Sequence, residues 1–223
     1  MTDPPEVRFL EALAPAEATA LRALAGRRRL PAGAALFHER ETGRDVIVLV
    51  SGRVKLSCVT DEGREAVLAI REPGDLIGEM SALDGAPRLA TATALEPVEL
   101  LALPADAFLA FLQRTPGAAM AMVRTLSRRL RDADRKRIGF LAQDTVGRVC
   151  SRLVELAERF GEPRDGGVHV DLAITQEELA GWSGSSREAA VKALRTLREL
   201  GWIATRRGGV TVLDVDALRR RAL

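Results

Sequence analysis

The stretch TQEELAGWSGSSREAAVKALRTLRELGWI, which begins at Thr175, constrains the fold of this 223-residue chain more than any other. Thr175 and Glu178 have the spacing of a helix-capping box, in which a hydroxyl and a carboxylate bind the first backbone N–H groups of a helix. Ser185 and Glu188 repeat this spacing. Gly184, between the two boxes, can adopt the positive φ of a tight turn. Two short helices joined by a glycine turn predict a helix-turn-helix.

The second of these helices presents side chains that can contact DNA bases. Arg187, Glu188 and Lys192 share the outer face of its N-terminal end, where a recognition helix meets base edges. Arginine can donate two hydrogen bonds to guanine, glutamate can accept from cytosine, and lysine can reach guanine or phosphate. Residues 185–209 contain six basic and two acidic side chains, although the net charge of the whole chain is only +2. This local charge predicts duplex DNA as a partner.

Residues 203–212 predict a β-hairpin with a basic loop that contains glycine. Such a hairpin can serve as a wing against DNA phosphates. The alternative is a helical hairpin with a charged exterior that binds no DNA; the capping boxes, the glycine turn and the wing together favour DNA. Besides the three base-reading candidates, we expect DNA contacts at Thr175, Gln176, Ser185, Ser186, Arg206 and Arg207.

Residues 27–104 have a different pattern, with glycines at short intervals and alternating apolar residues between them. This pattern predicts short antiparallel strands in a small barrel, roll or jelly-roll sandwich. Within it, the loop GEMSALDGAPRLATATA could hold a phosphate, with Glu79 accepting hydrogen bonds from a sugar. Leu89 follows Arg88, where a phosphate site would favour a hydroxyl. The structural alternative is that Glu79 and Arg88 only pair with each other.

A long helix is expected from Pro116 onward. Apolar residues recur along it at coiled-coil spacing, interrupted by one arginine: Val123, Leu126, Leu130, Ala133, Arg137 and Phe140. This seam favours a homodimer, and the alternative is a helix packed on its own domain. The basic run at 127–137 is interpreted as a solvated face. A further helix is expected at 145–160, followed by a polar break at 161–167 and a short strand ending near Leu172.

The composition argues against several other functions. Cys58 and Cys150 have no paired spacing, and His38 and His169 are the only histidines, so zinc, iron–sulfur, haem and other metal sites are not expected. No nucleophile elbow, Walker loop or HExxH motif is present, so we expect no catalytic residues and no enzyme. The first ten residues lack the pattern of a signal peptide, and no apolar run approaches the ~18 residues of a membrane span. We therefore expect a cytoplasmic protein.

Three segments resemble the Crp/Fnr family of bacterial transcription regulators. GEMSALDGAPR looks like its phosphate-binding cassette, GSSREAAVKAL like its recognition helix, and DTVGRV like its hinge. The resemblance implies an α+β fold with an antiparallel β-roll of the cyclic-nucleotide-binding type, a dimerisation helix and a C-terminal winged helix-turn-helix. The corresponding boundaries are 1–115, 116–141 and 142–223.

The resemblance also implies a homodimer on a near-palindromic operator with TGTGA-like half-sites. For the cyclic-AMP receptors of the family it places the effector at Gly78, Glu79, Met80, Ser81, Arg88, Leu89, Ala133 and Asp134. Those receptors have Ser or Thr after the arginine, and hydroxyl or amide side chains where Ala133 and Asp134 stand. A weakened site for cyclic AMP is therefore expected, with cyclic GMP as another ligand to test. The alternatives are a ligand-independent regulator, whose roll serves as a dimer scaffold or a contact for RNA polymerase, and a regulatory module for a partner protein.

Overall fold

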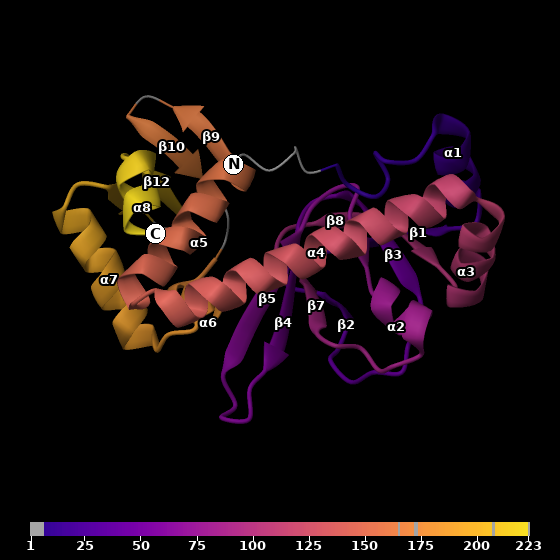
Figure 1. Ribbon diagram of the computed structural model, residues 1–223, viewed down its shortest axis with the longest axis horizontal. Coiled ribbons are helices and arrows are strands. Elements are labelled where there is room, and N and C mark those ends of the chain that lie inside the picture. The colour runs from indigo at the N-terminus through magenta and orange to yellow at the C-terminus, as the bar shows by residue number, and fades with distance from the viewer. Residues whose placement is uncertain (1–6, 165, 172–173, 207, 223) are drawn as a thin grey trace. The chain divides into compact units, whose positions relative to one another are not determined.

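The computed structural model describes residues 7–164, 166–171, 174–206 and 208–222 (Figure 1). The chain divides into two compact units. The first consists of Met1–Cys58 and Leu68–Asp132, and the second of Val59–Val67 and Ala133–Leu223. Among the described residues, no helix is both long and apolar enough to cross a bilayer.

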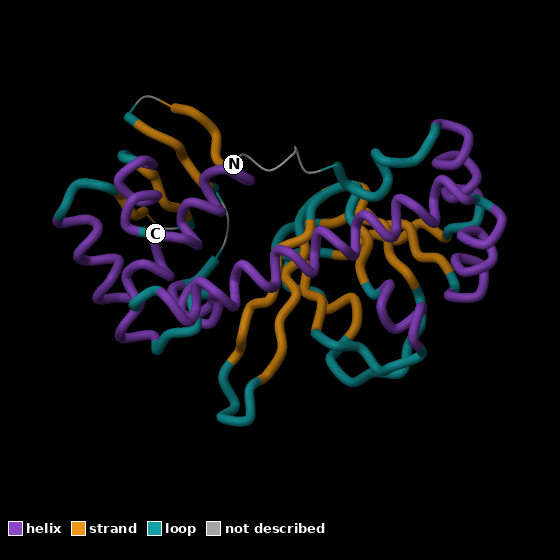
Figure 2. Tube along the Cα trace, viewed as in Figure 1, coloured by secondary structure: helices purple, strands orange, loops and turns teal. Residues whose placement is uncertain are grey.

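Two four-stranded antiparallel sheets form the roll (Figure 2). In spatial order the first contains β1 (Gly26–Leu30), β8 (Val98–Leu103), β3 (Val46–Ser51) and β6 (Leu76–Ile77). The second contains β2 (Ala35–Phe37), β7 (Thr91–Ala94), β4 (Val54–Val59) and β5 (Glu65–Arg71). The expected antiparallel roll is confirmed, including a hairpin turn between β4 and β5 in which Gly63 has a φ of 75°.

Strand β3 explains why both sheets are needed. Because successive side chains of a strand point to opposite faces, β3 contributes to two cores. Val46 and Val48 pack in a core with the helices, whereas Ile47 and Leu49 pack in the core of the roll. All four side chains are buried, and a strand buried on both faces requires a layer on each side.

Helices cover one side of the first sheet. They are α1 (Pro15–Ala23), α2 (Glu79–Asp84), α3 (Ala105–Arg114) and the first half of α4 (Pro116–Ala142). Phe9 and Phe108 lie in this core with their ring centroids 6.2 Å apart. In the first unit, α4 buries four residues: Ala118, Ala121, Met122 and Thr125.

The predicted seam of α4 is largely exposed in the single chain. Val123 is 55% exposed, Leu130 64% and Phe140 54%. Leu126 packs partly against the core of the first unit. The first half of α4 thus packs on the first unit with one face, and the helix presents apolar side chains on another.

The second unit contains α5 (Thr145–Phe160), α6 (Gln176–Trp182), α7 (Arg187–Glu199) and α8 (Val215–Arg221). Its sheet has the order β11 (Ile203–Arg206), β12 (Gly209–Val212), β10 (Gly167–Val170) and β9 (Gly161–Arg164). The expected helix-turn-helix and the hairpin after it are confirmed. Leu172, where we expected a strand to end, lies outside the described residues.

The polar break expected at 161–167 is wrong in part, because residues 161–164 form strand β9 along β10. Pro163 is tolerated there because β9 is an edge strand, which has an N–H position free of ladder bonding. These four residues form a strand because they pair with β10, and the local sequence does not indicate this pairing.

Candidate effector pocket and nucleic-acid interface

Arg88 is a buried arginine held by the backbone of the roll. Its side chain donates from Nη1 to the Gly78 carbonyl and from Nη2 to the Asp45 carbonyl, both at 2.7 Å. The guanidinium lies 4.2 Å from the centroid of the Phe37 ring. Its Nε is buried and has no hydrogen-bond partner within the described part of the chain. The guanidinium therefore keeps one buried donor available for an acceptor from outside.

Burial lowers the pKa of Arg88, and the nearby carboxylates of Asp45, Glu41 and Glu79 oppose this shift. The residue before α2 must be glycine. Gly78 has a φ of 80°, and a Cβ at this position would overlap the Arg88 guanidinium. The cassette thus brings a backbone carbonyl directly against the arginine.

Glu79 is also buried, and its partner is Arg129 of α4. Arg129 Nη1 donates to Glu79 Oε1 at 2.5 Å, and its Nη2 donates to the Leu76 carbonyl at 2.7 Å. Asp75 Oδ1 lies 4.0 Å from the same Nη2. One alternative from the sequence was that Glu79 and Arg88 only pair with each other. In the structure, Glu79 pairs with Arg129 instead, and Arg88 binds backbone carbonyls.

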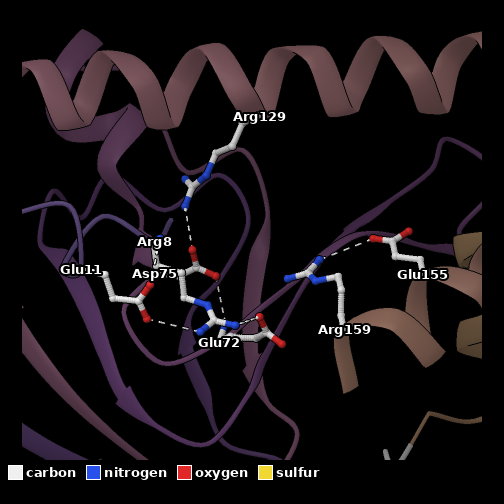
Figure 3. Close-up of polar contacts among 7 residues, drawn as sticks. All are labelled: Arg8, Glu11, Glu72, Asp75, Arg129, Glu155 and Arg159. Carbon is white, nitrogen blue, oxygen red and sulfur yellow. Dashed lines mark hydrogen bonds and ion pairs between the residues drawn. The ribbon is translucent and has the colours of Figure 1, made fainter. Parts of the chain in front are cut away.

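Arg129 joins a chain of charged groups in the first unit. Figure 3 shows Arg129 pointing from α4 toward Asp75, whose Oδ2 accepts from the Glu72 backbone N–H at 3.0 Å. Arg8 donates to Glu72 Oε2 at 2.5 Å and lies 3.5 Å from Glu11 Oε1. The carboxylates near the cassette are therefore held by cations from distant segments.

Our interpretation of residues 127–137 as a solvated face is wrong at Arg129, whose side chain is only 17% exposed. The helix geometry explains this. The buried positions 118, 121, 122 and 125 recur at helical spacing, and the next position on that face is 129. That continuation was the available sequence signal, and the surrounding basic residues obscured it.

The other residues that were expected to bind the effector differ in how exposed their side chains are. Ser81 is buried, whereas Met80 is 46% exposed and Leu89 62% exposed. Ala133 and Asp134 are exposed on α4 in the second unit, and Asp134 lies 3.8 Å from Arg137.

Helix α7 presents the expected base-reading residues. Arg187, Glu188 and Lys192 are all exposed. Hydrogen bonds to its own backbone N–H and to Ser186 lower the pKa of Glu188. The opposite face of α7 is buried through Ala190, Ala193, Leu194 and Leu197. An ionised acceptor therefore lies between two cations at the exposed start of this helix.

The capping box at Thr175 is confirmed, because Thr175 accepts from the Glu178 backbone N–H and Glu178 binds back to Thr175. The second box is wrong by one residue. Ser186 caps α7 by accepting from the Ala189 backbone N–H at 3.2 Å. The hydroxyl of Ser185 instead lies 2.9 Å from that of Ser183, because Ser185 belongs to the turn.

The turn between α6 and α7 contains the buried hydroxyl of Ser183. Ser183 satisfies it by donating to the Ala180 carbonyl at 3.1 Å. Trp182, the neighbouring residue in the chain, is buried as well. Gly184 has a φ of 57°, and a Cβ there would overlap the ring of Phe140. The helix-turn-helix is therefore intact with serine at this position.

Three of the other residues expected to contact DNA are exposed at the surface. Thr175 and Gln176 are exposed at the start of α6, and Arg206 is exposed at the end of β11. Arg207 lies outside the described residues.

No group of three or more His, Cys, Asp or Glu side chains that could hold a metal is present in the part of the chain that the structure describes.

Comparison with known families agrees with this architecture. Residues 27–115 match the family model of the cyclic nucleotide-binding domain. Residues 147–221 match that of the Crp-like helix-turn-helix domain.

Two relatives are similar over most of their length. One is the CRP-like cAMP-activated global transcriptional regulator of Mycobacterium tuberculosis, 35% identical over 192 residues, or 86% of each chain. The other is the cyclic AMP receptor protein of Thermus thermophilus, 34% identical over 210 residues, or 94% of each chain. Both relatives are named as regulators or receptors, in agreement with the expectation that this chain is not an enzyme.

Solved structures show the same fold. A transcriptional regulator of the CRP family from Thermus thermophilus has a TM-score of 0.76 at 28% identity, over 87% of this chain and 96% of that one. The c-di-GMP responsive global regulator of Xanthomonas campestris has a TM-score of 0.81 at 24% identity, over 89% and 99%, and shows the fold alone. The roll, the long helix, the winged helix-turn-helix and these relatives together show that the chain belongs to the Crp/Fnr family of transcriptional regulators.

Proposed function

We propose that this chain is a homodimeric regulator that binds a near-palindromic operator and is controlled by a cyclic nucleotide in its roll. The observation that carries the DNA-binding part is the exposed start of α7, where Arg187, Glu188 and Lys192 share one surface. Their donors and acceptor match the edges of guanine and cytosine in the major groove. If the protein activates transcription, RNA polymerase is a further candidate partner, whereas repression needs only occupation of the operator.

The exposed seam of α4 supports the homodimer. Exposed apolar side chains at coiled-coil spacing are stabilised by a second copy of the same helix. Two-fold symmetry would then present two α7 helices to half-sites about 34 Å apart, one turn of DNA.

Arg88 supports the effector part. Its buried Nε has no partner among the described residues, and an unsatisfied buried donor costs about 1–3 kcal/mol. A phosphate oxygen would supply the missing acceptor. Arg129 binds Oε1 of Glu79, so Oε2 can accept from a ribose hydroxyl. The two relatives named for cyclic AMP make this nucleotide the first candidate.

The site would be weaker than one with a hydroxyl group at position 89, because Leu89 offers the phosphate no hydrogen bond. A missing hydrogen bond to a charged group costs roughly 1.5–3 kcal/mol, or one to two decades in affinity. The second candidate is a ligand-independent regulator, which the exposed Leu89 favours because it offers no phosphate contact.

The DNA-binding proposal is tested by the affinities of the protein and of Arg187→Ala for an operator and for each single base-pair variant of it. The substitution should cost about 1–3 kcal/mol and relax the preference at one base pair. Arg195→Ala, at an exposed position of the same helix, is the matched control. Equal losses for all sequences would contradict the base-reading role.

The effector proposal is tested by thermal unfolding with millimolar cyclic AMP or cyclic GMP. A ligand at a hundred times its dissociation constant stabilises the protein by about 2.7 kcal/mol. The stabilisation should disappear in Arg88→Ala and persist in Arg22→Ala, an exposed position on α1. Absence of a shift with either nucleotide would favour the ligand-independent regulator.

A further inference from the structure

His169 is a buried histidine of the sheet formed by β11, β12, β10 and β9. It lies on β10 directly opposite Thr211 of β12, and it is only 3% exposed. Its Nδ1 is 3.0 Å from the Thr211 hydroxyl. Its Nε2 forms a hydrogen bond with Nη2 of Arg206, the exposed residue at the end of β11.

The strand register places these groups on one face of the sheet. Thr211 pairs across to Ala204, and Arg206 follows Ala204 by two residues on β11. Because alternate residues of a strand share a face, Arg206 points to the same side as Thr211 and His169. Position 209, opposite Arg206, is glycine, and a Cβ there would lie 3.4 Å from His169 Cε1 and 2.8 Å from the Val170 carbonyl. The glycine leaves room for the arginine against the imidazole.

The chemistry of arginine determines the state of this histidine. A guanidinium has only donors, so the Nε2 atom that faces Arg206 must be unprotonated. A neutral imidazole then carries its proton on Nδ1, from which it donates to the Thr211 hydroxyl oxygen. An imidazolium would direct a donor at the Arg206 guanidinium and would place two cations in contact. The arrangement therefore favours the tautomer that carries its proton on Nδ1.

We propose that His169 is a positioning residue that orients Arg206 toward a DNA phosphate. This inference rests on the proposed DNA-binding function and adds a residue that holds an arginine of the β11–β12 hairpin in place. One of the five N–H groups of Arg206 is used by His169, and the others remain for phosphate oxygens. An arginine loses rotamer freedom when it binds, and an anchored guanidinium has less of that freedom left to lose.

The first test observes the imidazole without DNA. The ¹⁵N NMR signals of His169 at neutral pH should show Nε2 as the unprotonated nitrogen and Nδ1 as the protonated one. Arg206→Ala should shift the Nε2 signal. The opposite tautomer, or an imidazolium, would overturn the inference whether or not the protein binds DNA.

The second test measures operator affinity as a function of salt concentration. Arg206→Ala should weaken binding about tenfold on all sequences and lower the slope of log K against log salt by about one. His169→Asn keeps a polar group near Nδ1 but removes the acceptor at Nε2, and it should give part of this loss. His169→Gln can place its amide oxygen near the Nε2 position and should restore most of the affinity. Arg220→Ala, exposed on α8, is the control with unchanged slope.

The double variant His169→Asn/Arg206→Ala should bind as Arg206→Ala does, because the histidine acts only through the arginine. Additive losses, or a Gln variant as weak as the Asn variant, would overturn the positioning role. A wild-type protein that binds no operator would overturn the proposed function instead, and the NMR result would still decide the state of His169.

Discussion

Replacement of Arg129 by methionine should destabilise the first unit strongly, because it leaves Glu79 as a buried carboxylate without its cation. Glu79 is 4% exposed, and its Oε1 lies 2.5 Å from Arg129 Nη1. The same arginine supplies a hydrogen bond to the Leu76 carbonyl. Removal of one partner from a buried ion pair costs about 3–5 kcal/mol. At about 2–4 °C per kcal/mol for a chain of this size, a loss of 3 kcal/mol lowers the Tm by about 6–12 °C.

The assay is thermal and denaturant unfolding of five proteins: wild type, Arg129→Met, Glu79→Gln, the double variant and the control Arg124→Met. The double variant should be more stable than Arg129→Met alone, because a neutral amide is cheaper to bury than an unpaired carboxylate. Arg124→Met, at an exposed position of the same helix, should change the Tm little. A Tm for Arg129→Met within the range of this control, or strictly additive effects of the two substitutions, would refute the reasoning.

Three further outcomes are expected. Ser186→Ala should lower the free energy of unfolding by about 1 kcal/mol through loss of the α7 cap, and Ser185→Ala by less; the reverse order in denaturant titrations would contradict the observed cap. Burial raises the pKa of Cys150 to about 11, so a thiol reagent should label Cys58 in the folded protein and Cys150 only after unfolding; equal rates would contradict this. Gly184→Ala should cost about 1–2 kcal/mol through its left-handed backbone alone, with a further penalty from overlap with Phe140; an unchanged Tm would contradict this.

The elements that the sequence predicted are those whose signals are local. Glycines and alternating apolar residues predicted the roll, and the Thr175 box predicted the start of α6. The second box failed by one residue because Ser185 and Ser186 are equally good capping residues, and the turn geometry decides between them. Strand β9 and helices α1, α2 and α8 were not expected, and the interpretation of GEMSALDGAPRLATATA as a loop is wrong where Glu79–Asp84 form α2 and Thr91–Ala94 form β7. Strand β9 is a four-residue edge strand with a proline, so its order comes from pairing with β10 rather than from its own sequence.

The candidate effector site was predictable only in its contiguous part. Glu79 and Arg88 belong to one short motif, and both are buried as a pocket requires. Their partners come from elsewhere: Arg129 follows Glu79 by 50 residues, and the Asp45 carbonyl comes from a distant loop. Every residue has a backbone carbonyl, so the sequence does not show which carbonyl will accept a hydrogen bond from Arg88. The bond between His169 and Arg206 depends in the same way on strand register, which a lone histidine in the sequence does not reveal.

The proposed control of operator binding by a cyclic nucleotide in the roll is tested most directly by the affinity for the operator with and without millimolar cyclic AMP. Coupling between two sites is typically 1–3 kcal/mol, so the nucleotide should change the Kd for the operator by about 5- to 150-fold. The effect should vanish in Arg88→Ala, while Arg187→Ala should weaken operator binding in both conditions. An identical operator Kd with and without nucleotide would contradict effector control and leave a ligand-independent regulator.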